Sequence, residues 1–255
     1  MRRSKWFWAA VAGMVLLGGV LIGCQSEEEK EEGGAIVEGT VLVGWENPKG
    51  KIRVPDGVTD IAEGVFKNQN EITGVVIPGS VVSIGKEAFY SCTGLRNVEI
   101  QGSELEIIGD AAFDRCAGLV SINIPNGVTS IGNYAFGHCS SLTTVKIPDS
   151  VVTLGEVAFG ECRALRDLTI GNGVEELKEG TFRYCTSLTS VTIPDTVMVI
   201  EGTVFLGCDK LTTLNISGNW RAERSGFAPQ DDVGTITIDM LQDSNLWYHI
   251  TYYRK

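Results

Sequence analysis

Cysteine is the residue type in this chain whose spacing most invites chemistry. Six cysteines recur at a nearly constant interval of about 23 residues, and Gln69 fills the equivalent place before them: Cys92, Cys116, Cys139, Cys162, Cys185 and Cys208. An even number of cysteines suggests disulfide bonds. In a stack of repeats, however, equivalent Cβ atoms stay about 5 Å apart, whereas a disulfide requires about 3.8 Å. We therefore expect a column of buried, reduced thiols that pack as small apolar side chains.

The two histidines offer little for metal binding. The chain has no C-x-x-C pair, so a zinc site would need ligands from unrelated parts of the fold. His138 stands beside Cys139, at a position that other copies of the repeat fill with Asn68, Ser91, Arg115, Glu161, Tyr184 or Gly207. Such variation indicates a tolerant surface position. We expect no metal and no cofactor.

No group of residues has the pattern of a catalytic site. Acid pairs such as Glu175-Glu176 and Asp231-Asp232 are typical of solvated faces. A nucleophile, its base and an orienting group do not stand out from the periodic background, and no glycine-rich loop follows a strand and opens a helix. The net charge of −11 argues against nucleic acid as a partner. The sequence predicts a protein that is not an enzyme.

Seven phenylalanines define the repeat that must position these residues. They also recur about every 23 residues, and the spacing is one residue longer only between the second and the third. The seven are Phe66, Phe89, Phe113, Phe136, Phe159, Phe182 and Phe205. A unit of about 23 residues cannot enclose a core of its own, so its apolar side is buried only against the units before and after it. The spacing predicts one elongated repeat solenoid over residues 54–216.

The repeat that ends at Ile147 shows the expected elements. Val145 and Ile147 alternate with polar residues, which predicts a strand with one buried face, and stacked copies would form a parallel sheet. Pro148 fixes φ and begins a turn. Residues 128–131 predict a second short extended segment, and residues 135–142 a tight helical turn.

This pattern resembles leucine-rich repeats of the BspA-like kind, whose hallmark is I-P-x-x-V-x-x-I-G-x-x-A-F-x-x-C-x-x-L-x-x-V-x-I-P. The resemblance covers about two thirds of the chain, and residues 39–45 and 54–58 resemble the opening segment of that family. It implies a right-handed, β-rich α/β leucine-rich repeat solenoid of about seven repeats, located on a bacterial surface or in the periplasm. It implies no catalytic residue.

The open ends of such a solenoid must be capped. We assign residues 35–53 to an N-terminal cap and residues 217–255 to a C-terminal cap. Trp45, Trp220 and Trp247 all lie outside the repeats. In the C-terminal cap, the runs 235–238 and 247–253 alternate as a closing pair of strands would. The alternative is that this aromatic segment docks a partner.

The N-terminus predicts export and a lipid anchor. Residues 1–5 are basic, residues 6–20 are apolar, and Leu21-Ile22-Gly23-Cys24 resembles a bacterial lipobox. We expect a signal peptide over residues 1–23 and a lipid on Cys24, with residues 24–34 as a disordered acidic tether. The alternative is an uncleaved transmembrane helix. Cleavage would remove three cations and no acid, so the net charge would change from −11 to −14.

Binding is the function that remains. The outward strand positions are small and mostly uncharged, which favours a flat or structural sheet face, and aromatic and arginine side chains gather only on the turn after each phenylalanine. The candidate interface residues are Tyr90, Arg115, His138, Arg183 and Tyr184. We expect a monomeric, lipid-anchored surface protein that binds an unknown protein, with adhesion to host matrix or cells implied by the resemblance. The alternatives are a periplasmic or envelope scaffold without a host ligand, and a glycan-binding module.

Overall fold

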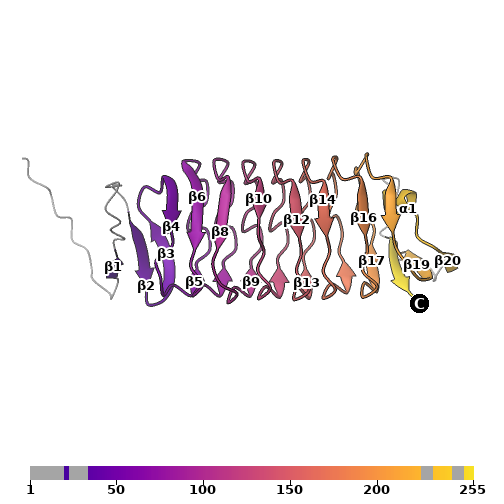
Figure 1. The fold of residues 1–255 in the computed structure, drawn as a ribbon, viewed down its shortest axis with the longest axis horizontal. Coiled ribbons are helices and arrows are strands. Elements are labelled where there is room, and N and C mark those ends of the chain that lie inside the picture. Colours follow the sequence, from indigo (N-terminus) through magenta and orange to yellow (C-terminus); the bar gives the residue numbers. More distant parts are fainter. Residues whose placement is uncertain (1–19, 23–33, 225–231, 243–249) are drawn as a thin grey trace, which may run out of the picture.

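The computed structural model describes residues 20–22, 34–224, 232–242 and 250–255. Residues 34–216 wind into a β-solenoid of about eight coils, with almost no helix (Figure 1). The predicted repeat solenoid is therefore confirmed. Paired strands of neighbouring coils bring together residues that are one sequence repeat apart, as in Val145 beside Leu168 and Val98 beside Ile122. The sequence period thus equals one full coil.

Each coil contributes two short strands, which form two columns of parallel strands. The first column contains β3 (Val41–Trp45), β5 (Asp60–Ile61), β7 (Ser83–Ile84), β9 (Ile107–Ile108), β11 (Ser130–Ile131), β13 (Thr153–Leu154), β15 (Glu176–Leu177) and β17 (Val199–Glu201). The second column contains β4 (Gly50–Arg53), β6 (Ile72–Ile77), β8 (Asn97–Ile100), β10 (Ser121–Ile122), β12 (Thr144–Lys146), β14 (Asp167–Thr169), β16 (Ser190–Thr192) and β18 (Thr213–Asn215).

The core between the two columns is a stack of the repeated apolar side chains. All seven repeat phenylalanines are fully buried. Neighbouring rings lie 4.8 to 5.9 Å apart, within 15° of parallel. Such aromatic pairs add about 1 kcal/mol each to the area that they bury. Trp45 packs on Phe66 at 5.6 Å and closes the N-terminal end of the stack.

The predicted helical turn over residues 135–142 is wrong. This segment forms consecutive hydrogen-bonded turns, because Tyr134 and His138 adopt left-handed backbone with φ of 56° and 55°. The amides of Tyr134, Phe136 and His138 then point along the solenoid and donate to carbonyls of the next coil at 2.8 to 2.9 Å. Alternate amides of the segment thus form a third ladder of backbone hydrogen bonds parallel to the axis, whereas Gly137, Cys139 and Leu142 donate to carbonyls three residues before them.

The cysteine column is buried and unbridged, as the sequence predicts: all six repeat cysteines are free thiols. Each Sγ donates a hydrogen bond to the phenylalanine carbonyl of the preceding coil, at 2.9 to 3.3 Å. Burial raises the pKa of the Cys92 thiol to about 12. These thiols serve as small buried side chains that also satisfy a carbonyl.

Antiparallel strands cover both ends of the first column. At the N-terminal end, β2 (Ala35–Glu38) pairs with β3, and β1 (Val20–Ile22) pairs with β2. At the C-terminal end, β21 (Ile250–Arg254) pairs with both β17 and β19 (Trp220–Arg224). The strand β20 (Asp232–Gly234) pairs with β19. The segment 35–53 therefore holds a hairpin strand and one additional coil, β3 and β4.

The C-terminal segment differs in detail from the sequence prediction. Residues 235–238 do not form a strand; they lead into the short helix α1 (Ile238–Gln242). Leu241 is buried, and the Gln242 side chain donates to the carbonyl of Cys208 at 2.8 Å. The helix is thus fixed to the last coil by one buried side chain and one hydrogen bond. The predicted strand over 247–253 is observed from Ile250 onward.

Several predictions fall outside the described residues: the lipidation of Cys24, nearly all of the predicted signal peptide and tether, and the roles of Trp247 and His249. Within the described ranges, no helix has the length and apolar character needed to cross a bilayer.

Candidate functional site

The five predicted interface residues lie along one side of the solenoid, on the turns that follow the repeat phenylalanines. Tyr90 and Arg183 directly follow Phe89 and Phe182. Arg115, His138 and Tyr184 come two residues after their phenylalanines, and all three have left-handed φ of 55° to 62°. We call this set of five side chains the turn face. Its members belong to four of five consecutive coils, so the structure places them in a row and not in one pocket.

A bridge of charged groups joins the middle of the turn face. His138 Nδ1 lies 2.9 Å from Asp114 Oδ1 in the preceding coil, and His138 Nε2 lies 3.3 Å from Glu161 Oε1 in the following coil. Arg115 approaches the same aspartate at 3.7 Å, and Arg163 holds Glu161 at 3.0 Å. The imidazole is therefore held between two carboxylates, across three coils.

The surroundings of Glu161 favour its charged form. The Asp114 side chain is only 9% exposed and lies against both His138 and Arg115. Burial works against the charged form of Glu161, but the hydrogen bond from Arg163 and the electrostatic interaction with His138 outweigh it. The pKa of Glu161 consequently lies below its ordinary value.

The two ends of the turn face are built from aromatic contacts. At one end, the Lys67 ammonium lies over the Tyr90 ring, 5.1 Å from its centre. At the other end, Tyr184 lies against Gly207 of the next coil: a Cβ added there would come within 2.3 Å of the tyrosine ring. The glycine leaves room for the ring, which remains 42% exposed. Tyr184 thus packs against the next coil and still exposes part of its ring to a partner.

The structure adds residues that the sequence did not single out. Tyr134 is 38% exposed and lies four residues before His138, at the other left-handed position of the same turn. Asp114 and Glu161 contact His138; the sequence indicated Glu161 only as a variable residue of the repeat and did not indicate Asp114. Tyr134 could have been found from the repeat itself. Its position, four residues before that of His138, is filled by a glycine in another coil, Gly180, which indicates left-handed backbone there.

Other surfaces offer less for binding. On the second column, outward side chains such as Thr192 and Asn215 bond to each other, at 3.2 Å. On the first column, Ile107, Val152 and Met198 are exposed, but polar residues such as Thr129 and Glu175 separate them. Across the described parts of the chain, no group of three or more His, Cys, Asp or Glu residues could hold a metal ion.

Comparison with known proteins agrees with this architecture. A profile described as the BspA type leucine rich repeat region matches six copies, over residues 48–122 and 106–228. The chain belongs to the BspA-type leucine-rich repeat family. A leucine-rich repeat protein from Bacteroides ovatus is 25% identical, with a TM-score of 0.65 over 80% of this chain. The match covers 53% of the Bacteroides protein, so this chain spans about half of its length.

A second solved structure supports the same assignment. The Treponema pallidum leucine-rich repeat protein is 31% identical, with a TM-score of 0.59, over 66% of this chain and 83% of its own. No curated protein matches the chain. These two neighbours are described as leucine-rich repeat proteins, and their descriptions name no ligand and no reaction.

Proposed function

We propose that this chain is a non-enzymatic surface lipoprotein that binds another protein through the turn face. The proposal rests on the backbone hydrogen bonds of the turns that carry those side chains. Arg115, His138 and Tyr184 lie on turns whose amides are hydrogen-bonded to the next coil at 2.6 to 2.8 Å. Because this backbone is already ordered, binding through these side chains adds no cost for ordering the turn itself.

The chemistry of the turn face suits a protein partner. Tyrosine and arginine are enriched among the residues that carry most of the binding energy in protein interfaces. The coils are about 5 Å apart, so the row from Tyr90 to Tyr184 spans about 20 Å. That length matches an elongated contact with another folded protein. The outward strand positions carry no aromatic ring in the second column, which weakens the case for a glycan-binding module.

Binding is tested with the Arg115→Ala/Tyr184→Ala variant. The parent is immobilised and exposed to a panel of purified host matrix proteins and to a surface-protein extract, and bound proteins are quantified. We expect the variant to lose about tenfold or more in affinity for any captured protein. The matched control is Thr144→Ala/Thr192→Ala on the second column, which should bind as the parent does. Equal loss in both variants, or no loss in either, contradicts the role of the turn face.

Lipid anchoring is the second part of the proposal. A lipid on Cys24 would hold the protein at a membrane through the tether of residues 24–34. We expect Cys24→Ser to move the protein from the membrane fraction to the soluble fraction and to remove the acyl mass from its N-terminus. An unacylated N-terminus in the parent protein contradicts this part.

Adhesion to host matrix or cells is the specific role that we propose for the surface protein, and an envelope scaffold is the alternative. Mild protease treatment of intact cells separates them. Release of solenoid fragments from intact cells supports exposure to the outside. Complete protection until the envelope is broken contradicts adhesion and favours the scaffold.

A further inference from the structure

The caps protect the two columns unequally. At the C-terminal end, the first column continues from β17 into β21, β19 and β20. In the second column, the last strand is β18, and among the described residues it pairs only with β16. The described strands of the C-terminal segment all belong to the other sheet. Among the described residues, no strand pairs with the outer edge of β18.

The backbone groups on this edge can be assigned from the register. Thr213 N donates to Thr189 O, and Asn215 O accepts from Ile193 N, so both residues face the preceding coil. Alternate residues of a parallel strand point to opposite sides. The N–H and C=O of Leu214 consequently face away from β16, toward the place that a further coil would occupy.

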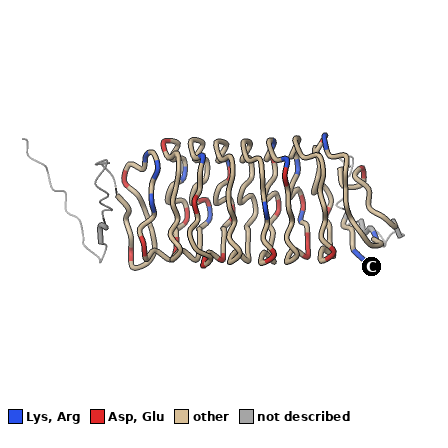
Figure 2. The backbone as a smooth tube through the Cα atoms, in the orientation of Figure 1, with Lys and Arg blue, Asp and Glu red and all other residues tan. Residues whose placement is uncertain are grey.

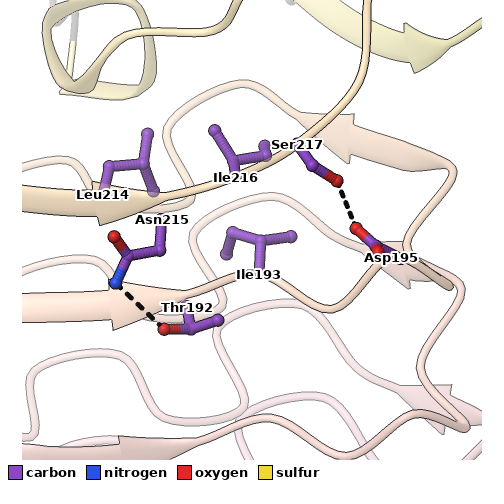
Figure 3. Close-up of a pocket in the computed structure, with 7 residues that line it drawn as sticks. All are labelled: Thr192, Ile193, Asp195, Leu214, Asn215, Ile216 and Ser217. Atoms are coloured by element: carbon purple, nitrogen blue, oxygen red, sulfur yellow. Dashed lines mark hydrogen bonds between the residues drawn. The ribbon is translucent and has the colours of Figure 1, made fainter.

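The side chains at this edge are incompletely covered. Leu214 and Ile216 are half-buried, whereas their equivalents one coil earlier, Val191 and Ile193, are 2% and 3% exposed. Figure 3 shows Leu214 and Ile216 beside Ile193 in a groove of about 420 Å³.

The polar side chains of this groove already have partners. Asn215 donates to Thr192, and the Asp195 carboxylate accepts from Ser217 and lies 3.5 Å from Arg254 (Figure 3). What the groove leaves unmatched is the N–H and the C=O of Leu214 and two apolar side chains.

The opposite end of the second column is protected differently. The strand β4 carries Lys51 and Arg53 at the positions equivalent to Thr213 and Asn215, and Figure 2 shows this basic group on the first coil. Charged residues on an edge strand discourage the addition of another strand. In contrast, β18 reads Thr213-Leu214-Asn215 and carries no charge. Among the described residues, the C-terminal edge of this column therefore lacks the charges that the N-terminal edge carries.

A second copy of the chain cannot use this edge by stacking end to end. Pairing of its β4 with β18 would place its β3 where β21 lies, so its β2 would overlap β17 and its β5 would overlap β19. One extended segment meets no such obstacle, because it occupies only the second column. The geometry thus excludes a whole solenoid and admits a single strand.

We propose that the edge of β18 binds an extended segment of a partner protein, added parallel to β18 as a ninth strand of the second column. Strand addition of this kind takes its affinity from main-chain hydrogen bonds and its specificity from alternate side chains. Leu214 and Ile216 require apolar residues at two alternate positions of that segment, and its other side faces solvent. This site is separate from the turn face and does not depend on it.

The probe is a fluorescent ten-residue peptide with the sequence of residues 187–196, Ser-Leu-Thr-Ser-Val-Thr-Ile-Pro-Asp-Thr, which already has the required alternation. Fluorescence anisotropy with the full mature chain should give saturable binding with a Kd of about 100 μM or tighter. A peptide with lysine in place of its valine and its isoleucine is the matched control and should not bind. No binding of the first peptide, or equal binding of both, overturns the proposal.

Variants of the chain locate the peptide. Thr213→Lys/Asn215→Arg copies the protection of β4 onto exposed positions of β18 and should weaken binding about tenfold. Ser190→Lys/Thr192→Arg adds the same charge one strand further in and should leave binding nearly unchanged. Leu214→Pro removes the outward N–H and should abolish binding, whereas Leu214→Ala should only weaken it. Thermal melting confirms that each variant folds. Equal binding by all folded variants places the peptide elsewhere and overturns the proposal.

Hydrogen exchange gives an independent readout. The Leu214 amide should exchange rapidly in the free chain, and more slowly once the peptide is bound. A Leu214 amide already protected without peptide would mean that the chain pairs this edge itself, which also contradicts the proposal.

Discussion

Each repeat cysteine donates a hydrogen bond that alanine could not donate. Its Sγ reaches the phenylalanine carbonyl of the preceding coil, and that carbonyl also accepts an amide from its own turn, as Phe89 does from Cys92. The cysteine is small enough for the core and polar enough for the second lone pair of the carbonyl. The column therefore reflects a packing requirement and not redox chemistry.

The thiols should be inert in the folded protein. Burial raises the pKa of Cys92 to about 12 and that of the deeper Cys139 well above its ordinary value, so almost no thiolate exists at pH 8. We expect no alkylation of the six repeat cysteines by iodoacetamide under native conditions, and alkylation of all six in guanidinium. Peptide mass mapping counts the labels and treats Cys24 separately. Native labelling of Cys139, or a mass lower by two hydrogens per cysteine pair, contradicts this prediction.

The Glu161 bridge should make stability depend on pH. The folded-state pKa of Glu161 is depressed, so the charged carboxylate stabilises the fold above the unfolded pKa, near 4.5, and this contribution is lost as pH falls through the folded value. We expect Glu161→Gln to cost about 0.5 kcal/mol at pH 7, as a partly exposed ion pair does. Thermal melts should show the difference vanishing by pH 3. A difference that persists at pH 3 reflects lost packing and contradicts the electrostatic account. Glu156→Gln, on an exposed turn, is the control.

At the scale of the element, the turn is held by two left-handed residues four positions apart. Glycine occupies the first position in Gly64 and Gly180, but Val157 and Thr203 occupy it in other coils, with φ of 53° and 64°. Left-handed backbone costs a non-glycine residue about 1–2 kcal/mol, and a β-branched one is the least suited. Inter-coil hydrogen bonds must compensate for this strain.

Thr203→Gly should therefore stabilise the protein. Relief of the strain exceeds the entropy that glycine adds to the unfolded chain, so we expect a gain of about 0.5–1 kcal/mol. Thr192→Gly, on an exposed position of β16, should cost about the same amount, because glycine weakens a strand. Chemical denaturation measures both variants. If Thr203→Gly destabilises as much as Thr192→Gly, the strain at this turn is not real.

This turn also marks the limit of what the sequence predicts. Strand periodicity and turn chemistry are local, so Val145, Ile147 and Pro148 were assigned correctly. The helical turn expected over residues 135–142 does not form, because alternate amides of this segment donate to the next coil. Likewise the bridge between Asp114 and Glu161 joins residues that are two repeats apart in the sequence, and nothing in the sequence indicates their register until the coils are stacked.

At the scale of the molecule, the sequence undercounts the coils for a related reason. The first coil, β3 and β4, lacks both the phenylalanine and the cysteine of the repeat, and Trp45 takes the place of the ring. A pattern defined by contacts between coils cannot identify a coil whose outer side packs against a hairpin strand and not against another coil. Its strands are nevertheless in register with β5 and β6, because strand pairing needs only the alternation.

If neighbouring coils alone stabilise each other, removal of one complete coil should be tolerated. Deletion of residues 140–162 removes one full repeat and joins Cys139 to Arg163, so every column remains in register. A solenoid behaves as a row of units with nearest-neighbour contacts. We expect this variant to fold cooperatively, with a lower melting temperature and an m-value reduced by about one eighth, because m scales with the surface exposed on unfolding.

Deletion of residues 140–151 is the matched control, since it removes only about half a coil. It would bring strand residues of one coil opposite turn residues of the neighbouring coil. Buried side chains such as Phe159 would then lose the stacked ring of the preceding coil. We expect this shorter deletion to unfold the protein or to cause aggregation, whereas the longer one does not. Circular dichroism and urea denaturation distinguish the two. Equal loss of structure in both variants would mean that the stability is shared along the whole rod, and that the single coil is not its cooperative unit.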